Sequence, residues 1–177
     1  MSKNLWVLDP VHSEITFKVR HMMITNVSGV FQSFSGSMNS SAADFTDAEI
    51  SFEADIESIT TRNEQRDEHL RSSDFFEAQN YPKLKFTSSS FVKESDSNYK
   101  MSGILSFRGV EKAIDLEVIY RGTVIDPWGN VKAGFEINGS ILRKDFNLNW
   151  NATNDTGVAV LSDDVKLLIS AQLVRQI

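Results

Sequence analysis

The residue types that could do chemistry in this chain are its three histidines, its arginines and its carboxylates. The histidines are His12, His21 and His69, and no two of them are two residues apart, the spacing that puts metal ligands on one face of a strand. Because the chain has no cysteine, thiolate ligands, disulfides and cysteine nucleophiles are excluded. We therefore expect no metal site and interpret the histidines as structural or hydrogen-bonding residues.

Motifs for nucleophilic or cofactor chemistry are also missing. The sequence holds no Gly-x-Ser-x-Gly elbow and no glycine-rich phosphate loop, so we expect no catalytic serine and no cofactor. One acid–base alternative stays open, in which His69 or His21 works with Asp67 on a lipid-like substrate. A general base is recognised by its distance from the proton that it removes, and a sequence does not give that distance.

Basic residues form a stripe on the helix that we predict after Thr61. Arg62, Arg66 and His69 fall at i, i+4 and i+7 and would share one helical face. Like charges at this spacing disfavour an isolated helix, whereas a bound carboxylate or phosphate would reverse the effect. The stripe predicts either a site for an anionic headgroup or a solvated surface offset by neighbouring acidic residues.

The elements that must position these residues are strands, because apolar and polar side chains alternate along most of the chain. Residues 14–20 and 49–57 show the alternation most clearly, with one apolar and one polar face. Further strands are predicted at residues 30–38, 84–91, 99–107, 113–125, 131–142 and 165–174. About eight antiparallel strands close a small barrel with room for side chains or one ligand.

Residues 61–78 depart from the strand pattern. Thr61 to Glu64 has the form of a capping box, and the residues that follow are rich in helix formers. Leu70 is the only large aliphatic residue of this helix, so we expect the helix at an edge or mouth of the barrel. The adjacent rings of Phe75 and Phe76 would then cover the opening.

Composition limits the partners. The chain has 24 Asp and Glu against 18 Lys and Arg, a net charge of -6 without a basic block, which argues against nucleic acid. With 41% hydrophobic residues, we expect one folded domain over residues 1–177.

No apolar run has the length of a signal peptide or membrane span, so we expect a cytoplasmic protein, or a periplasmic one if a leader has been removed.

The aromatic residues fit either a packed core or the wall of a cavity, and the size of a closed eight-stranded barrel is what favours a cavity. The chain has 12 Phe and 3 Trp but only 3 Tyr, so most rings lack a polar group and many fall on the apolar phase of strands. The predicted ligand-binding wall comprises Ile15, Phe17, Val19, Phe52, Phe86, Leu105, Phe107, Phe135 and Ile137. Around an opening we expect Leu70, Phe75 and Phe76, with Arg66, His69 and His21 near a polar headgroup.

Four motifs carry a resemblance to a known family. They are Arg62-x-x-x-Arg66-Asp67-x-His69-Leu70-x-Ser72-x-Asp74-Phe75-Phe76, Tyr81-Pro82-x-Leu84-x-Phe86, Gly103-x-Leu105-x-Phe107-x-Gly109 and Arg143-x-Asp145-Phe146-x-Leu148-x-Trp150. Together they resemble the YceI-like proteins, the polyisoprenoid-binding, lipocalin-like family, over nearly the whole chain. Asn147 stands where that family usually has glycine, a departure that affects a local turn.

The resemblance implies an all-β fold, an extended antiparallel eight-stranded lipocalin-like barrel with one or two short helices at a mouth. It implies a tunnel for a polyisoprenoid, an isoprenoid quinone-like molecule or a fatty-acyl chain, often in a homodimer, and it establishes no catalytic residues. Our main hypothesis is non-enzymatic binding of such an amphiphilic lipid. The alternatives are a lipid-modifying enzyme with His and Asp as acid and base, and a ligand-free structural or stress-response module with a filled core.

Overall fold

The computed structural model describes residues 3–151 and 160–177, and most of these residues lie in β-strands. The strands are β1 (Asn4–Leu8), β2 (Glu14–His21), β3 (Thr25–Phe31), β4 (Phe34–Ser40), β5 (Glu49–Asp55), β6 (Ile59–Thr60), β7 (Lys83–Lys93), β8 (Asn98–Phe107), β9 (Val110–Ile125), β10 (Val131–Leu142) and β11 (Leu161–Arg175). The described residues hold one α-helix, α1 (Glu64–Arg71), and the 3-10 helices η1 (Pro10–His12), η2 (Ile56–Ser58) and η3 (Arg143–Phe146).

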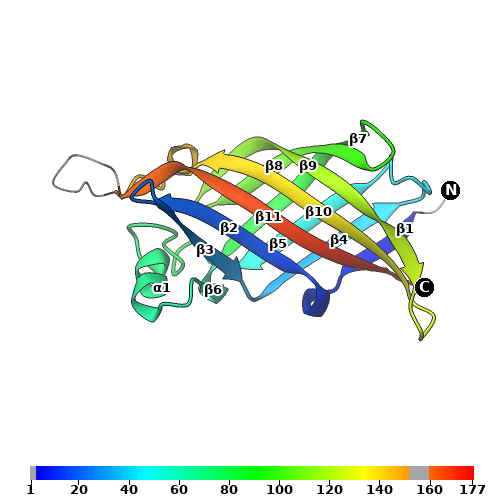
Figure 1. Ribbon diagram of the computed structural model, residues 1–177, viewed down its shortest axis with the longest axis horizontal. Coiled ribbons are helices and arrows are strands. Elements are labelled where there is room, and N and C mark those ends of the chain that lie inside the picture. The colour runs from blue at the N-terminus through cyan, green and yellow to red at the C-terminus, as the bar shows by residue number, and fades with distance from the viewer. Residues whose placement is uncertain (1–2, 152–159) are drawn as a thin grey trace.

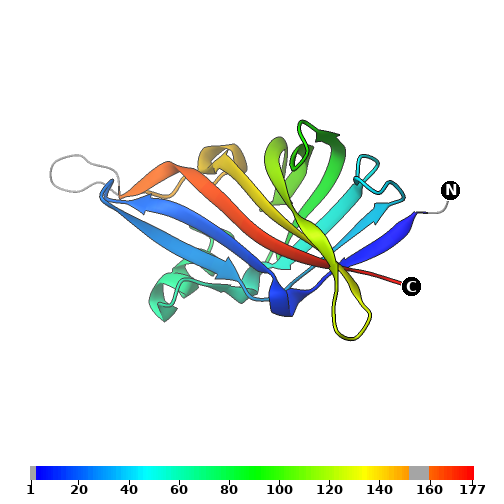
Figure 2. The ribbon, with the colours of Figure 1, turned by 45° about the vertical axis from the view of Figure 1, so that its right-hand side comes forward.

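The strands form one antiparallel sheet that closes on itself as an elongated barrel (Figures 1 and 2). Its closed ring runs β1-β4-β5-β7-β8-β9-β10-β11, and β11 pairs back with β1. The predicted all-β fold and eight-stranded antiparallel barrel are confirmed. Beyond this ring β2, β3 and β6 continue the sheet from β11, toward the end of the barrel where α1 lies.

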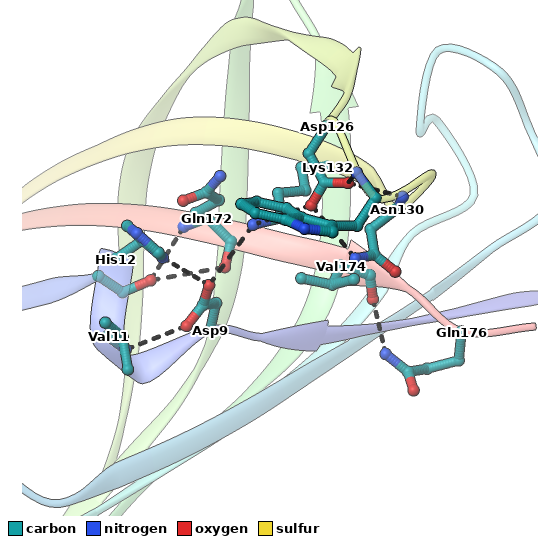
Figure 3. Close-up of polar contacts among 11 residues, drawn as sticks. Asp9, Val11, His12, Asp126, Asn130, Lys132, Gln172, Val174 and Gln176 are labelled. Atoms are coloured by element: carbon teal, nitrogen blue, oxygen red, sulfur yellow. Dashed lines mark hydrogen bonds and ion pairs between the residues drawn. The ribbon is translucent and has the colours of Figure 1, made fainter.

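Closure depends on β11, which pairs with β2 along its first part and with β1 at its end. Between β1 and β2 the chain bends at η1, where the Asp9 amide donates to the Gln172 carbonyl at 2.8 Å. The Asp9 carboxylate lies 2.8 Å from Nδ1 of His12 and 4.0 Å from Nζ of Lys132, which also pairs with Asp126 at 3.5 Å (Figure 3). The hydrogen bond with His12 is the main cause that lowers the pKa of Asp9.

Two sequence predictions about strands are wrong in detail. Residues 30–38 were predicted as one strand, but β3 ends at Phe31 and β4 begins at Phe34. The chain changes neighbours there, because β3 pairs with β2 and β6 whereas β4 pairs with β1 and β5. The short strand β1 was missed because its apolar residues run consecutively instead of alternating.

The helix at residues 61–78 is shorter than predicted, and a different residue caps it. The Asn63 side chain accepts a hydrogen bond from the Arg66 amide at 2.9 Å, so Asn63, and not Thr61, is the N-cap. Arg62 precedes the helix with φ of 66°, in the left-handed region. Asn147 ends η3 with φ of 61°, a conformation that asparagine tolerates better than most residues and glycine best.

The far end of the barrel from α1 is plugged by an aromatic cluster. Phe45, in the loop between β4 and β5, is 3% exposed and packs edge-on against Trp6, Tyr120 and Phe135, with ring centroids 5.5 to 5.6 Å apart. The hydroxyl of Tyr99 donates to the carbonyl of Asp44 in the same loop at 2.5 Å. This loop therefore closes one end of the barrel.

Asp47 holds the plug loop in shape. Its carboxylate accepts hydrogen bonds from the hydroxyls of Ser40 and Ser41, both at 2.6 Å, and from the amides of Ser41 and Ala42 at 2.8 and 3.1 Å. These bonds hold the pKa of Asp47 far below its usual value, the hydroxyl of Ser40 making the largest contribution. The ionised carboxylate therefore stabilises the folded state.

We expect Asp47→Asn to lower the melting temperature at neutral pH and to flatten its dependence on acid. Since the folded pKa lies below the value of about 3.9 for an unfolded aspartate, the stabilisation is complete above that pH and is lost as the pH falls toward the folded pKa. Melting curves between pH 7 and pH 2 measure this, with Asp96→Asn in an exposed turn as the control. An acid profile of Asp47→Asn parallel to that of the wild type would contradict it.

Candidate functional site

The barrel encloses a cavity of about 380 Å³ with an almost wholly apolar wall. Each residue predicted from the sequence as a ligand contact lies on this wall. From the strands these are Ile15, Phe17, Val19, His21, Phe52, Phe86, Leu105, Phe107, Phe135 and Ile137, and from α1 and the segment after it Arg66, His69, Leu70, Phe75 and Phe76. The structure therefore brings the predicted set together, and their contact with a ligand stays a prediction.

The alternation of the strands explains why these residues meet. Successive side chains of a strand point to opposite faces, so Ile15, Phe17 and Val19 of β2 share the inner face. Glycine on the neighbouring strand makes room for the larger rings. A Cβ atom on Gly29 would lie 2.3 Å from Cζ of Phe17, and one on Gly103 would lie 2.6 Å from Cζ of Phe86.

The end of the cavity beside α1 is its mouth. Here the wall includes Arg66, which is exposed, and His69, whose side chain is 39% exposed. Nε2 of His69 lies 2.8 Å from Oδ2 of Asp74, and its ring packs edge-on against Phe75 and Trp150. The predicted position of the helix at a mouth of the barrel is confirmed, since α1 lies at one end of the barrel (Figure 1). His69 is held there by a carboxylate and two rings.

The predicted basic stripe does not form, because Arg62 lies before the helix. Arg66 is on α1, but its Nε donates to Oγ1 of Thr61 at 2.6 Å and its Nη2 donates to the Thr61 carbonyl at 2.7 Å. Two of its nitrogens therefore anchor the start of the helix. The prediction that Arg62, Arg66 and His69 share one helical face is wrong.

The acid–base pairing of Asp67 with a histidine is also absent from the described residues. Asp67 is 5% exposed, and its Oδ1 accepts hydrogen bonds from the amide and the hydroxyl of Thr61 at 2.8 and 2.6 Å. It does not lie on the cavity wall, and the carboxylate beside His69 is Asp74. Within residues 3–151 and 160–177, no three His, Asp or Glu side chains gather as metal ligands.

Arg143 is a residue of the cavity wall that the site prediction missed. It is 3% exposed, its Nε donates to the Ser162 carbonyl at 2.9 Å, and its Nη1 donates to the carbonyls of Leu148 and Trp150 at 2.9 and 3.0 Å. Burial lowers the pKa of its guanidinium, which nevertheless stays charged. The signal was present in the sequence, since Arg143 continues the inward phase of Phe135, Ile137, Gly139 and Ile141.

A closed antiparallel barrel with an apolar cavity and a helix at its mouth defines a lipocalin-like protein of the kind that holds a small apolar ligand. Within that class, a model of the YceI-like domain matches residues 6–173. The chain belongs to the YceI-like family.

Relatives and solved structures agree with this assignment. Protein YceI of Salmonella newport is 34% identical over 165 residues, which cover 93% of this chain and 83% of the relative. The crystal structure of the Campylobacter jejuni YceI protein is 32% identical, with a TM-score of 0.77 over 89% of this chain and 90% of that one. A polyisoprenoid binding domain from Saccharophagus degradans has a TM-score of 0.73 at 17% identity, over 97% and 98% of the two chains, and shares the fold.

Two alanines test whether the cavity is an empty space. Ala171 lies on its wall, whereas Ala54 lies off the wall, is 1% exposed and packs in a buried cluster with Ile56 and Ile59. We expect Ala171→Phe to abolish uptake of the apolar dye Nile red with little change in melting temperature. Ala54→Phe should overpack its cluster, lower the free energy of unfolding by about 1 to 3 kcal/mol, and leave dye uptake by the folded protein unchanged. Equal destabilisation by both changes would contradict an empty cavity.

Proposed function

We propose that this protein binds and carries an amphiphilic lipid with a long apolar chain, without transforming it. The observation that carries the proposal is the cavity, whose volume of about 380 Å³ falls in the range of about 300 to 1,000 Å³ usual for small-molecule sites. Its wall of aliphatic and aromatic side chains offers apolar contact along the barrel. A flexible hydrocarbon gains about 0.8 kcal/mol for each methylene that it buries in such a space.

The ligand class that we propose is a polyisoprenoid, an isoprenoid quinone-like molecule or a fatty-acyl chain. Membership of the YceI-like family supports it, and so does the shared fold of the polyisoprenoid binding domain from Saccharophagus degradans. In our proposal the apolar tail contacts inner-face residues such as Phe17, Phe86 and Phe135. Leu70, Phe75 and Phe76 then cover the tail near the mouth.

The other two hypotheses have weaker support. A lipid-modifying enzyme would need an acid–base pair at the cavity, and Asp67 faces Thr61 and not a histidine. A ligand-free structural or stress-response module would have a filled core, whereas this barrel encloses a cavity. Binding and carriage of a lipid, by contrast, require only the apolar cavity that the barrel encloses.

Native mass spectrometry of the protein purified from its own source tests the proposal. We expect a bound species that adds the mass of one lipid and that organic solvent extracts, because an apolar ligand in an enclosed site dissociates slowly. Ala171→Phe serves as the matched variant and should lack the added mass. The same spectra test the predicted homodimer.

A second arm uses purified lipids. Protein stripped of ligand should bind oleic acid and farnesol, measured by the quenching of Trp150 fluorescence at the mouth and by displacement of Nile red. Absence of co-purified lipid, together with no binding of either probe, would contradict the proposed function.

A cytoplasmic location stays a prediction that cell fractionation tests. None of the described helices is long and apolar enough to cross a membrane.

A further inference from the structure

The charged and ionisable side chains on the cavity wall are all basic. Within the described residues they are His21, Arg66, His69 and Arg143, and the wall includes no Asp, Glu or Lys. In an apolar space with little water, a cation acts over a longer range than it does at the surface. The positive charges of Arg66 and Arg143 at this wall would therefore favour an anionic group over a neutral or cationic one.

Two of these four side chains are held by protein partners. Arg66 donates through Nε and Nη2 to Thr61, and His69 lies 2.8 Å from the carboxylate of Asp74. Both also lie at the solvent-exposed mouth, where charge is screened. Neither has the buried, unpaired charge that would select strongly for an anion.

Of the four, only Arg143 is buried, because His21 and His69 are half-buried and Arg66 is exposed. Nε and Nη1 of Arg143 use all their hydrogens on the carbonyls of Ser162, Leu148 and Trp150, while Nη2 donates to no described residue. No buried side-chain nitrogen or oxygen of the described residues is sealed in the protein without a partner. Nη2 therefore reaches accessible space, and Arg143 lies on the cavity wall.

The carbonyl groups orient the guanidinium but do not neutralise it. No carboxylate of the described residues lies within 4.0 Å of Arg143, and the nearby Asp163 forms its ion pair with Lys144 at 3.6 Å. An uncompensated buried cation is costly, and an anionic partner in a dry site offsets that cost. Arginine also presents paired N–H groups that match the oxygens of carboxylate and phosphate.

We propose that Arg143, through Nη2, binds the anionic headgroup of the lipid, a carboxylate or a phosphate, inside the barrel. This inference rests on the proposed function and names the ligand's polar end. It moves the headgroup from the rim, where the sequence predicted it, to the buried guanidinium of Arg143. The tail would then run along β10 toward Phe135, a strand path of about 23 Å from Leu142 at 3.3 Å per residue.

Matched lipids measure the preference for an anion. Oleate, oleyl phosphate and oleyl alcohol share one tail and differ in headgroup, so the ratio of their dissociation constants reports on the headgroup alone. We expect wild-type protein to bind the two anions about 10- to 100-fold more tightly than the alcohol, the range for a hydrogen bond to a charged group. Arg143→Gln should bring the ratio close to one.

Three further variants separate this role from a structural one. Arg143→Lys keeps the charge and should keep most of the preference. Arg108→Gln removes an arginine that also donates to two backbone carbonyls, of Asn147 and Ser73, but lies off the cavity wall, and it should leave the ratio unchanged. Arg66→Gln tests the rim. A ratio that falls with Arg66→Gln and not with Arg143→Gln would overturn the proposal.

Carbon-13 NMR of oleate labelled at its carboxyl carbon gives a test on the wild-type protein, independent of how the variants fold. Beside a guanidinium the bound carboxyl stays ionised and its pKa falls, whereas in an apolar cavity without a cation its pKa rises. We expect a carboxylate signal that persists below the pH at which free oleate titrates. A bound carboxyl that is protonated at neutral pH would overturn the proposal.

Three other outcomes distinguish the ways in which the proposals fail. If acetate or inorganic phosphate binds as tightly as oleate or oleyl phosphate and this depends on Arg143, the site serves a free anion and the headgroup proposal is wrong. If oleyl alcohol binds as tightly as oleate, only the headgroup inference fails. If none of the lipids binds, the proposed function itself fails.

Discussion

The pairing of β11 with β1 is the constraint on which the rest of the structure depends, because it closes the sheet with only three residue pairs, Trp6 with Arg175, Val7 with Val174 and Leu8 with Leu173. Closure removes the free edges of the ring, so every strand is obliged to turn its apolar face toward the same space. The bend at η1, held by Asp9 and its hydrogen bonds, lets one segment of chain pair with β11 as β1 and then as β2.

The two ends of the barrel are built differently, and this difference gives the cavity a direction. At one end Phe45 fills the space between aromatic rings, held by the hydrogen bonds of Asp47 to the loop. At the other end the cavity wall is formed by α1 and by the rings around His69. The residues of α1 are polar except for Leu70, so the helix offers little apolar surface to close this end. A chain-like ligand would therefore enter from the side of α1 and point its far end at the plug.

The electrostatics of the interior follow from burying one arginine, Arg143, with no carboxylate of the described residues within 4.0 Å and with Asp163 as a more distant neighbour. Backbone carbonyls fix Arg143 at the start of η3 while leaving its charge in place, so the protein tolerates a buried cation that a ligand is able to compensate. By contrast, the arginine and histidine at the mouth are already engaged with Thr61 and Asp74. Both arginines donate to protein oxygens, so burial, and not residue type, is what distinguishes Arg143 from Arg66.

Alternation by itself determined which side chains share a face, because a strand has a period of two whatever its neighbours. That is why the wall from Ile15 to Ile137 was predictable residue by residue, and why Arg143 was recoverable from the same phase. Only the tertiary structure decided that residues 30–38 break into β3 and β4, since the break reflects a change of pairing partners distant in sequence. It also decided that Arg62 leaves the helical face and that Nη2 of Arg143 donates to no described residue, because both depend on which backbone groups the folded chain brings within hydrogen-bond distance.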